Sequence, residues 1–415
     1  MRIKDICDFV SRGCTPSYVE YSPYKVMNQA TFSKGFLDES NLRYTENANP
    51  VARICKGDLL IASTGGGVLG KVYYYDADDT SFYADSHVSI LRSSKNSMKY
   101  LYYYFFIRYE MINSTMVKGS TNQTELQKNY LLNHDVEIPS LKTQQKVVRF
   151  LDEKISIIDQ KVALLTAKRE LFKAQKQVLI NKVTNMGLNG NHFIAKRKVS
   201  RLGGYPIEWR LYRIKDIAYL YSGLTGKSGD DFRSEDISKQ KPFIPYTNIL
   251  NNTYINECQF SYVVLEDGEN QNLVKRNDLL FLMSSEDYES IAKTAVVKND
   301  VGELYLNSFC KGVRFYDEKL VYAPFVNYQL SSTNFRDYLR LEARGFTRIN
   351  IKVDKISSMF VFLPPLEEQK TIVSYLDEKC AKIDTIICNI NIQIDKLQSL
   401  KKSLINEVIS GKRTV

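Results

Sequence analysis

Two stretches of the chain, residues 139–183 and 364–408, share one hydrophobic pattern and align residue for residue without a gap. Beyond their opening prolines, neither contains a proline or glycine that would interrupt a helix. In both, apolar residues recur at every seventh position, with a second apolar row between, which is the spacing of a coiled-coil seam. We therefore predict two long helices that pack through these rows, which are Leu151, Ile158, Leu165, Phe172 and Leu179, and Leu376, Ile383, Ile390, Leu397 and Leu404.

Polar positions repeat as well, because Gln144 and Asp152 of the first stretch recur as Gln369 and Asp377 of the second. Internal self-similarity of this kind indicates a duplicated architecture, whereas an ordinary helical hairpin inside one core is the simpler alternative. Lysines and an arginine interrupt the seam, and we expect their charged ends to reach water or that part of the helices to face another protein. These residues are Arg169, Lys176 and Lys401.

The segments outside the two helices also repeat each other. Residues 1–138 contain short apolar runs bounded by Gly, Asp and Ser, which predict strands at 58–62, 71–75 and 87–91 and a helix at 99–111. The sequence Arg-Ile-Lys-Asp-Ile occurs at 2–6 and again at 213–217, and Asp-Leu-Leu occurs at 58–60 and again at 278–280. Polar loops at 119–121 and 345–347 also correspond. We predict an α+β protein with two mixed α/β domains that share one arrangement of strands and helices and differ in their loops.

This repeat predicts the domain organisation. The expected parts are a first domain at 1–138, a helix at 139–187, a linker at 188–204, a second domain at 205–363 and a helix at 364–415. Because the second helix starts where the second domain ends, its shortest route runs back along the first helix. We therefore expect antiparallel helices that join and separate two domains related by a pseudo-twofold axis.

Composition narrows the class of partner. The 415-residue chain has a formal charge of +10 and 12% aromatic residues, which favours a polyanionic partner. Charges within the first ten residues predict no signal peptide, and no apolar run is long enough to cross a bilayer. Seven cysteines without a Cys-x-x-Cys pair predict reduced thiols and a cytoplasmic protein. Lys196, Lys198 and Arg201 make the linker basic, which either keeps it solvated or serves phosphate contact.

Catalytic motifs are weak or missing. Gly65, Gly70 and Lys71 match the spacing of a phosphate-binding loop, but Val72 stands where a Ser or Thr should hold magnesium, and a strand follows instead of a helix. The segment 363–366, Leu-Pro-Pro-Leu, lacks the Asn or Asp and the aromatic residue of an adenine methyltransferase loop. His87, His134 and His192 have no metal-ligand spacing. We expect no enzyme activity, no metal and no bound cofactor, and a lysine-bearing turn at 64–71 able to approach a nucleic-acid phosphate.

Taken together, the order of domain, Pro-x-Leu-x-x-Gln helix, domain and Pro-Pro-Leu-Glu-Glu-Gln helix resembles the specificity subunit of type I restriction–modification enzymes over essentially the whole chain. The resemblance implies two target recognition domains that each read one half of a split DNA sequence. It also implies that the helices set the distance between the half-sites and dock two methyltransferase subunits, with restriction subunits added for cutting. S-adenosylmethionine, ATP and magnesium would belong to those partners.

Candidate DNA contacts are the polar and basic residues of the corresponding loops, because Lys and Arg bind phosphates while Arg, Asn and Gln also read base edges. They are Lys71, Lys118, Thr121 and Gln123 in the first domain, and Lys293, Arg344, Thr347, Arg348 and Asn350 in the second. Arg344 and Arg348 have an alternative as structural ion-pair partners. For the whole chain, the alternatives are a self-contained DNA-binding regulator and a coiled-coil scaffold, but we find no helix-turn-helix pattern.

Overall fold

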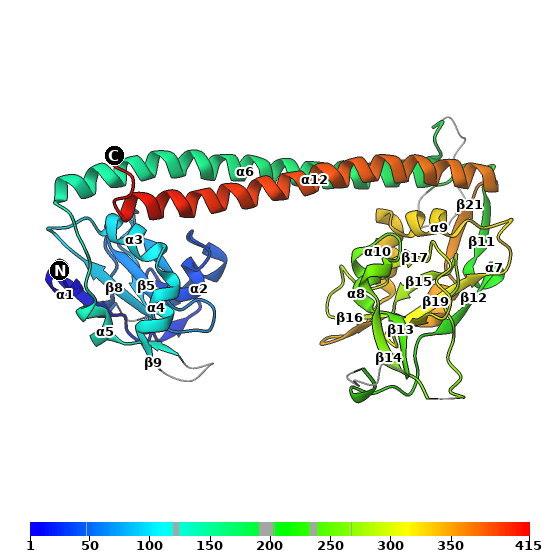
Figure 1. The fold of residues 1–415 in the computed structure, drawn as a ribbon, viewed down its shortest axis with the longest axis horizontal. Coiled ribbons are helices and arrows are strands. Elements are labelled where there is room, and N and C mark those ends of the chain that lie inside the picture. The colour runs from blue at the N-terminus through cyan, green and yellow to red at the C-terminus, as the bar shows by residue number, and fades with distance from the viewer. Residues whose placement is uncertain (47, 119–123, 191–201, 203, 233–238, 267) are drawn as a thin grey trace. The chain divides into compact units, whose positions relative to one another are not determined.

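The computed structural model describes residues 1–46, 48–118, 124–190, 202, 204–232, 239–266 and 268–415, and it divides into two compact units. Unit 1 contains Met1–Thr166 and Asn391–Val415, and unit 2 contains Ala167–Ile390. Each unit consists of an α/β head and a portion of each of two long helices, α6 (Leu141–Met186) and α12 (Leu366–Ile409) (Figure 1). We call residues 1–138 head one and residues 205–363 head two.

Head one contains two four-stranded sheets and short helices. One sheet has the order β1-β8-β5-β6 and the other the order β2-β4-β3-β7. Neighbouring strands are antiparallel except β3 and β7, which are parallel. The elements are α1 (Ile3–Ile6), β1 (Phe9–Arg12), β2 (Tyr18–Val19), β3 (Lys25–Met27), α2 (Gln29–Phe32), β4 (Arg43–Thr45), β5 (Leu59–Ala62), β6 (Val72–Tyr74), β7 (Phe82–Ala84), β8 (Val88–Arg92), α3 (Met98–Phe106), α4 (Tyr109–Thr115), β9 (Val117–Lys118), β10 (Glu125–Leu126) and α5 (Lys128–Asn133).

Head two repeats this plan with variations. Its main sheet has the order β12-β19-β15-β17, and a second sheet has the order β14-β13-β18, in which β13 and β18 are parallel. The elements are β11 (Arg210–Arg213), α7 (Ile214–Ile217), β12 (Ala218–Ser222), β13 (Gln240–Ile244), α8 (Tyr246–Asn251), β14 (Ser261–Val264), β15 (Leu279–Leu282), β16 (Ser284–Ser285), β17 (Thr294–Val296), β18 (Tyr305–Leu306), β19 (Cys310–Phe315), α9 (Ala323–Leu330), α10 (Thr333–Glu342), β20 (Ile349–Asn350), α11 (Val353–Ser357) and β21 (Phe360–Leu363).

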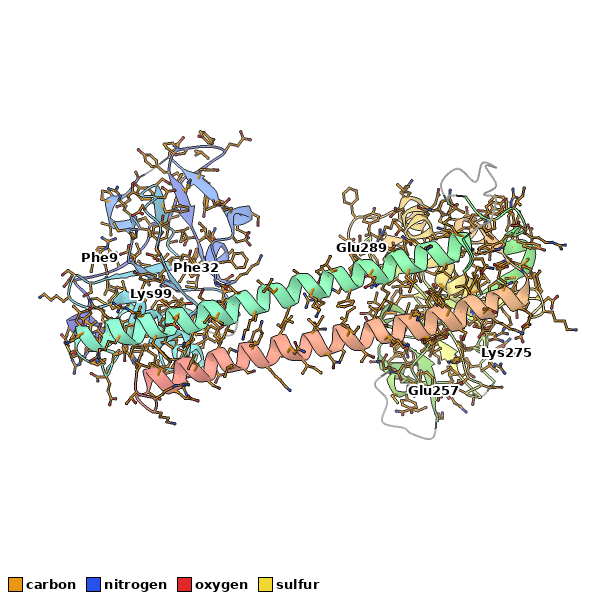
Figure 2. The ribbon with its side chains drawn as sticks, turned by 90° about the horizontal axis from the view of Figure 1, so that it is seen from above. Phe9, Phe32, Lys99, Glu257, Lys275 and Glu289 are labelled. Atoms are coloured by element: carbon orange, nitrogen blue, oxygen red, sulfur yellow. The ribbon has the colours of Figure 1, made fainter. Side chains whose placement is uncertain are left out.

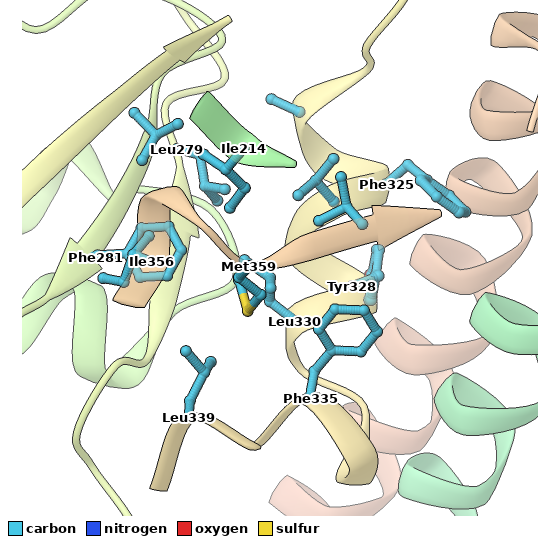
Figure 3. Close-up of a cluster of buried hydrophobic side chains, with 14 of the residues drawn as sticks. Ile214, Leu279, Phe281, Phe325, Tyr328, Leu330, Phe335, Leu339, Ile356 and Met359 are labelled. Atoms are coloured by element: carbon cyan, nitrogen blue, oxygen red, sulfur yellow. The ribbon is translucent and has the colours of Figure 1, made fainter. Parts of the chain in front are cut away.

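In both heads the central strand of the main sheet is buried on both faces. Successive side chains of a strand point to opposite faces, so Leu59 and Ile61 of β5 enter one apolar cluster while Leu60 enters another. In head two, Leu279 and Phe281 of β15 share the cluster of α9 and α10, which Figure 3 shows. The cluster on this same face also takes in side chains of the long helices, so each head is packed against its own portions of α6 and α12.

The two long helices are antiparallel within each unit. The start of α6 and the end of α12 enter the same cluster in unit 1, through Leu151 and Leu404 among others. The end of α6 and the start of α12 do so in unit 2, through Ile180 and Leu376. The predicted seam is uneven: Leu151, Ile158, Leu376, Ile383, Ile390 and Leu404 are buried, whereas Leu165, Phe172, Leu179 and Leu397 are half-buried.

The repeated glutamines fasten each head to the helix that follows it. Gln144 is fully buried, accepts a hydrogen bond from the backbone N–H of Ser97 at 2.8 Å and donates to the Pro139 carbonyl at 2.9 Å. Gln369 makes the matching bonds with the backbone of Tyr322 (2.8 Å) and Pro364 (2.8 Å). A buried amide that satisfies backbone groups on two segments fixes their relative position.

The repeated aspartates make a second fastening. The Tyr103 hydroxyl donates to Asp152 at 2.6 Å in unit 1, and the Tyr328 hydroxyl donates to Asp377 at 2.6 Å in unit 2. Burial, followed by the aspartate, raises the pKa of both tyrosines. Each tyrosine therefore remains a neutral hydrogen-bond donor at physiological pH.

Charged residues in the seam pair across the two helices. The Lys401 ammonium lies 2.8 Å from Asp159, and the Lys176 ammonium lies 2.6 Å from Asp384. Lys401 is the repeat equivalent of Lys176, and Asp384 is that of Asp159, so one pairing appears twice with the roles of the helices exchanged. The aspartate of the opposite helix therefore accounts for Lys176 and Lys401 in the seam, and neither lysine requires a partner protein there.

Some local predictions need correction. The helix expected at 99–111 is two helices, α3 and α4, with a break at Ile107 and Arg108. Within the segment 188–204 that was expected to be a linker, Leu202 is buried in the apolar cluster of head two. All seven cysteines are free thiols, and none of the helices in the described ranges is long and apolar enough to span a membrane.

Candidate nucleic-acid interface

The loop after the central strand has the same backbone geometry in both heads. In head one, Ala62 donates its N–H to the Lys71 carbonyl at 2.8 Å, and in head two Leu282 donates to the Lys293 carbonyl at 2.9 Å. The residue before each lysine has positive φ, +83° at Gly70 and +55° at Ala292. Lys71 and Lys293 therefore occupy equivalent positions, and in head one a strand, β6, follows the loop instead of the helix that a nucleotide site requires.

A second segment packs beside this loop in each head. In head one, the β9–β10 hairpin bridges to the loop through Thr64 and Glu125. In head two, β20 pairs with β16, so Ser284 lies opposite Asn350. The β9–β10 pair in head one and β20 in head two therefore lie next to these two loops, residues 63–71 and 284–293, which we call the lysine loops. The polar segment 119–121 itself lies outside the described residues.

The predicted contacts of head one are only partly within the described residues. Lys118 is exposed at the base of the hairpin and pairs in register with Glu125, while Thr121 and Gln123 lie outside the described residues. Glu125 forms an ion pair with Arg12 of β1. The His87 ring accepts or donates a 2.6 Å hydrogen bond with the Thr64 hydroxyl, which joins the end of the sheet to the glycine loop.

In head two, the predicted contacts Thr347 and Arg348 are exposed on the tight turn before β20, and Asn350 is exposed within β20. Gly345 makes this turn possible, because its φ is +147° and a Cβ there would lie 2.0 Å from the Arg348 carbonyl oxygen. The Arg348 guanidinium is 4.5 Å from the centre of the Phe309 ring. It lines a cavity of about 200 Å³ together with Tyr246, Ser284 and Asp287.

Arg344 has different surroundings from Arg348. Its guanidinium donates hydrogen bonds to the carbonyls of Leu341 and Ala343, the latter at 2.7 Å, at the end of α10. Cations at a helix C-terminus satisfy carbonyls that have no partner within the helix. The side chain of Arg344 therefore has a structural task, and its role as a DNA contact remains a prediction.

Aromatic side chains around this turn were missed by the sequence reasoning. Phe346 is completely exposed, and Tyr246, Tyr288 and Phe309 are each more than two-fifths exposed. Exposed aromatic residues clustered on one surface are typical of an interaction site. Their signal in the sequence was the position of Phe346 inside the polar loop, between Gly345 and Thr347.

Two further arginines, Arg336 and Arg340 of α10, were also missed, and they line a separate cavity with Lys293. Burial lowers the pKa of Lys293, and the neighbouring Arg336 lowers it further. The spacing of the two arginines, four residues apart on one predicted helix, was the available signal. Within the described ranges, no group of three or more His, Cys, Asp or Glu side chains is arranged to hold a metal ion.

Comparison with known families agrees with this architecture. Residues 1–170 and 206–396 both match the family described as the type I restriction modification DNA specificity domain. Because the match covers most of the chain and occurs once in each half, the protein belongs to this family. The resemblance drawn from the repeated helix motifs is thus confirmed, and with it a role in the DNA specificity of a type I restriction–modification system.

Individual relatives are distant in sequence. A Methanocaldococcus jannaschii protein provisionally named the type I restriction enzyme MjaX specificity subunit is 23% identical, across 99% of this chain and 92% of its own. The EcoKI specificity subunit of Escherichia coli is 23% identical across 51% of this chain and 45% of its own. A solved chain from work on assembly of a type I system aligns over 99% of this chain and 96% of its own with a TM-score of 0.67 and 15% identity, which supports the fold.

Proposed function

We propose that the chain is the DNA-reading subunit of a type I restriction–modification complex, in which each head reads one half of a split target. The observation that carries this proposal is the equivalence of the two lysine loops, which share backbone hydrogen bonds but differ in sequence. Loops that keep one scaffold while their side chains vary are suited to reading different base sequences.

In this proposal the long helices also dock partner subunits. Four aliphatic residues spaced seven apart on α6, Ile157, Leu164, Leu171 and Val178, are between 44% and 72% exposed. A row of exposed aliphatic residues on a helix is favourable only when another apolar surface covers it. The predicted seam residues are largely used inside the chain, so we assign docking of two methyltransferase subunits to this outer row. Restriction subunits would join when DNA is cut.

We further propose that the chain is not itself an enzyme. Adenine-N6 methylation would be carried out by the methyltransferase subunits with S-adenosylmethionine, and ATP with magnesium would serve the restriction subunits. The complex would act on DNA in the cytoplasm, in keeping with the seven free thiols. The rival proposals remain a self-contained DNA-binding regulator and a helical scaffold.

Methylome sequencing tests this proposal directly. A methylation-free host would express the chain together with the methyltransferase encoded beside it, and a matched strain would omit this chain. We expect methylated adenines in both halves of a split, asymmetric motif, present only when the chain is expressed. An unmodified genome, despite a soluble complex of the two proteins, would favour a regulator or scaffold. A continuous motif would mean that one head alone reads bases.

A further inference from the structure

Head two contains a cavity of about 340 Å³ in which three cationic side chains converge. Arg336 and Arg340 reach it from α10 and Lys293 from the lysine loop, while Gln177 of α6 and Asn252 line other parts. Glu289, the carboxylate in its lining, is labelled beside α6 in Figure 2. None of these residues except Lys293 was among the contacts predicted from the sequence.

The charges in this cavity are incompletely paired. Glu289 forms an ion pair with Arg340, which also lies 3.1 Å from Asp337. Lys293 has no ion-pair partner among the described residues. Arg336 donates from Nη2 to the backbone carbonyls of Glu289 (3.0 Å) and Ile291 (2.7 Å), but no carboxylate reaches it.

Two guanidinium nitrogens of residues that line the cavity are buried without any partner. They are Nη1 of Arg336 and Nε of Arg340. A buried N–H donor without an acceptor costs free energy, and the cost is larger when the donor belongs to a charged group. An oxyanion in the cavity would supply the missing negative charge for the side chains that line it.

Electrostatics point the same way. Burial lowers the pKa of Arg336 to about 10, and Arg340 contributes to this decrease. Burial also lowers the pKa of Lys293, with Arg336 as the next cause. Asp287 and Glu289 oppose the decrease at Lys293 without reversing it. The fold therefore holds the positive charges of Lys293, Arg336 and Arg340 close together where they are poorly solvated.

Head one shows that this charge is not required by the fold. Asn113 of α4 occupies the position of Arg336 and donates from Nδ2 to the Leu69 carbonyl at 3.0 Å, as Arg336 does to the equivalent Ile291 carbonyl. A neutral amide is thus sufficient to tie the helix to the loop. The guanidinium in head two adds a positive charge beyond this structural need.

We propose that the cavity formed by Lys293, Arg336 and Arg340 binds one phosphodiester group of the DNA backbone. This inference rests on the proposed function, since it assumes that the 284–293 loop faces DNA. Guanidinium groups bind phosphate oxygens through paired N–H donors, and a nearby ammonium adds a point charge. Such a contact positions the duplex against head two without reading its sequence. Head one, with asparagine at this place, lacks the contact.

Arg336→Asn is the decisive variant, because it introduces the side chain that head one already uses. We expect the full-length variant to bind a duplex with the methylated motif and a scrambled duplex more weakly by a similar factor, roughly tenfold. The slope of log affinity against log salt concentration is negative, and its magnitude should decrease by about 0.9, the value for one phosphate contact. Lys293→Gln should act in the same direction. Lys319→Gln, which removes an exposed charge from head two away from the cavity, is the matched control and should leave both quantities unchanged.

Inorganic phosphate gives a second readout that does not depend on DNA. It should raise the Tm of the wild-type chain more than that of Arg336→Asn, compared with chloride at equal ionic strength. Equal phosphate effects, together with unchanged duplex affinity and salt slope in the variant, would overturn the proposal. A lost phosphate effect with unchanged duplex binding would overturn the DNA assignment and point to a carboxylate of a partner subunit. Failure of the wild-type chain and its methyltransferase complex to bind any duplex would instead refute the proposed function, while the phosphate comparison would still report on the cavity.

Discussion

The two arginines that flank the turn before β20 look alike in the sequence but have different surroundings. Arg344 is bound to carbonyls at the end of α10, whereas Arg348 lies over Phe309 at an exposed cavity with no ion-pair partner in the described part of the chain. The alternative of a structural role therefore suits Arg344, and the role of base contact suits Arg348. The two arginines are the same residue type, and they differ in the groups that surround their guanidinium ends.

Arg348→Ala should weaken binding to the specific DNA site by more than tenfold at fixed salt, because an arginine contact to guanine contributes about 1–3 kcal/mol of discrimination. Binding to a scrambled duplex should change much less. Fluorescence anisotropy with both duplexes measures this. The comparison variant is Arg344→Ala, which should lower the Tm by removing a helix-end contact. Unchanged specific affinity in Arg348→Ala would remove this residue from the reading surface.

The long helices illustrate how a repeated residue reports on packing. Gln144 and Gln369 recur because each one is buried and satisfies backbone groups on both sides of a helix start. Asp152 and Asp377 recur because each accepts a hydrogen bond from a tyrosine of the adjoining head. Lys176 and Lys401 recur because each one meets the aspartate that the opposite helix presents.

Gln144→Leu should destabilise unit 1 by about 1–3 kcal/mol, since it leaves the Ser97 N–H and the Pro139 carbonyl without their partner. Gln145→Leu changes the exposed neighbouring residue in the same way and should have an effect below about 0.5 kcal/mol. Urea unfolding followed by circular dichroism compares the two. Equal stability of both variants would show that the buried amide does not fasten the helix.

Across the whole chain, the two heads combine one frame with different chemistry on their loops. Head one carries a glycine-rich loop and head two an acidic loop with Tyr288, although the backbone hydrogen bonds at the lysine positions agree. Arg336 against Asn113 is a further difference at one structural position. The two heads thus present different side chains on a common backbone frame.

Single substitutions should accordingly affect one half of the methylated motif. Lys118→Gln alters an exposed residue of head one and Thr347→Ala an exposed residue of head two. Methylome sequencing of each variant should show relaxed base preference in opposite halves, with the other half unchanged. A variant that relaxes both halves together would contradict independent reading by the two heads.

Much of the architecture could be predicted from the sequence, because periodic patterns of apolar residues depend on local helix geometry. A seven-residue apolar repeat predicts a long helix with a seam, and the second occurrence of that repeat indicated duplicated domains and the family. The seam residues Leu165 and Phe172 are only half-buried, since the pattern does not state how closely the helices approach at each position. The break between α3 and α4 was also missed, because an aromatic run at 100–107 gives no signal of a turn.

Less of the candidate site could be predicted from the sequence. Polar loops could be identified as candidates, and the structure brings Lys293, Arg348 and Asn350 to the same region of head two. The convergence of Arg336 and Arg340 on Lys293 could not be predicted, because it depends on how α10 packs against a loop distant in sequence.

The sequence alone thus specifies the two helices, their repeat and the family, because these depend on spacing along the chain. Tertiary structure decides which charged groups remain without partners, because pairing and burial depend on residues far apart in sequence. Arg344 is engaged by the end of its own helix, while Arg336 keeps a buried donor without an acceptor. That difference exists only once the heads have folded.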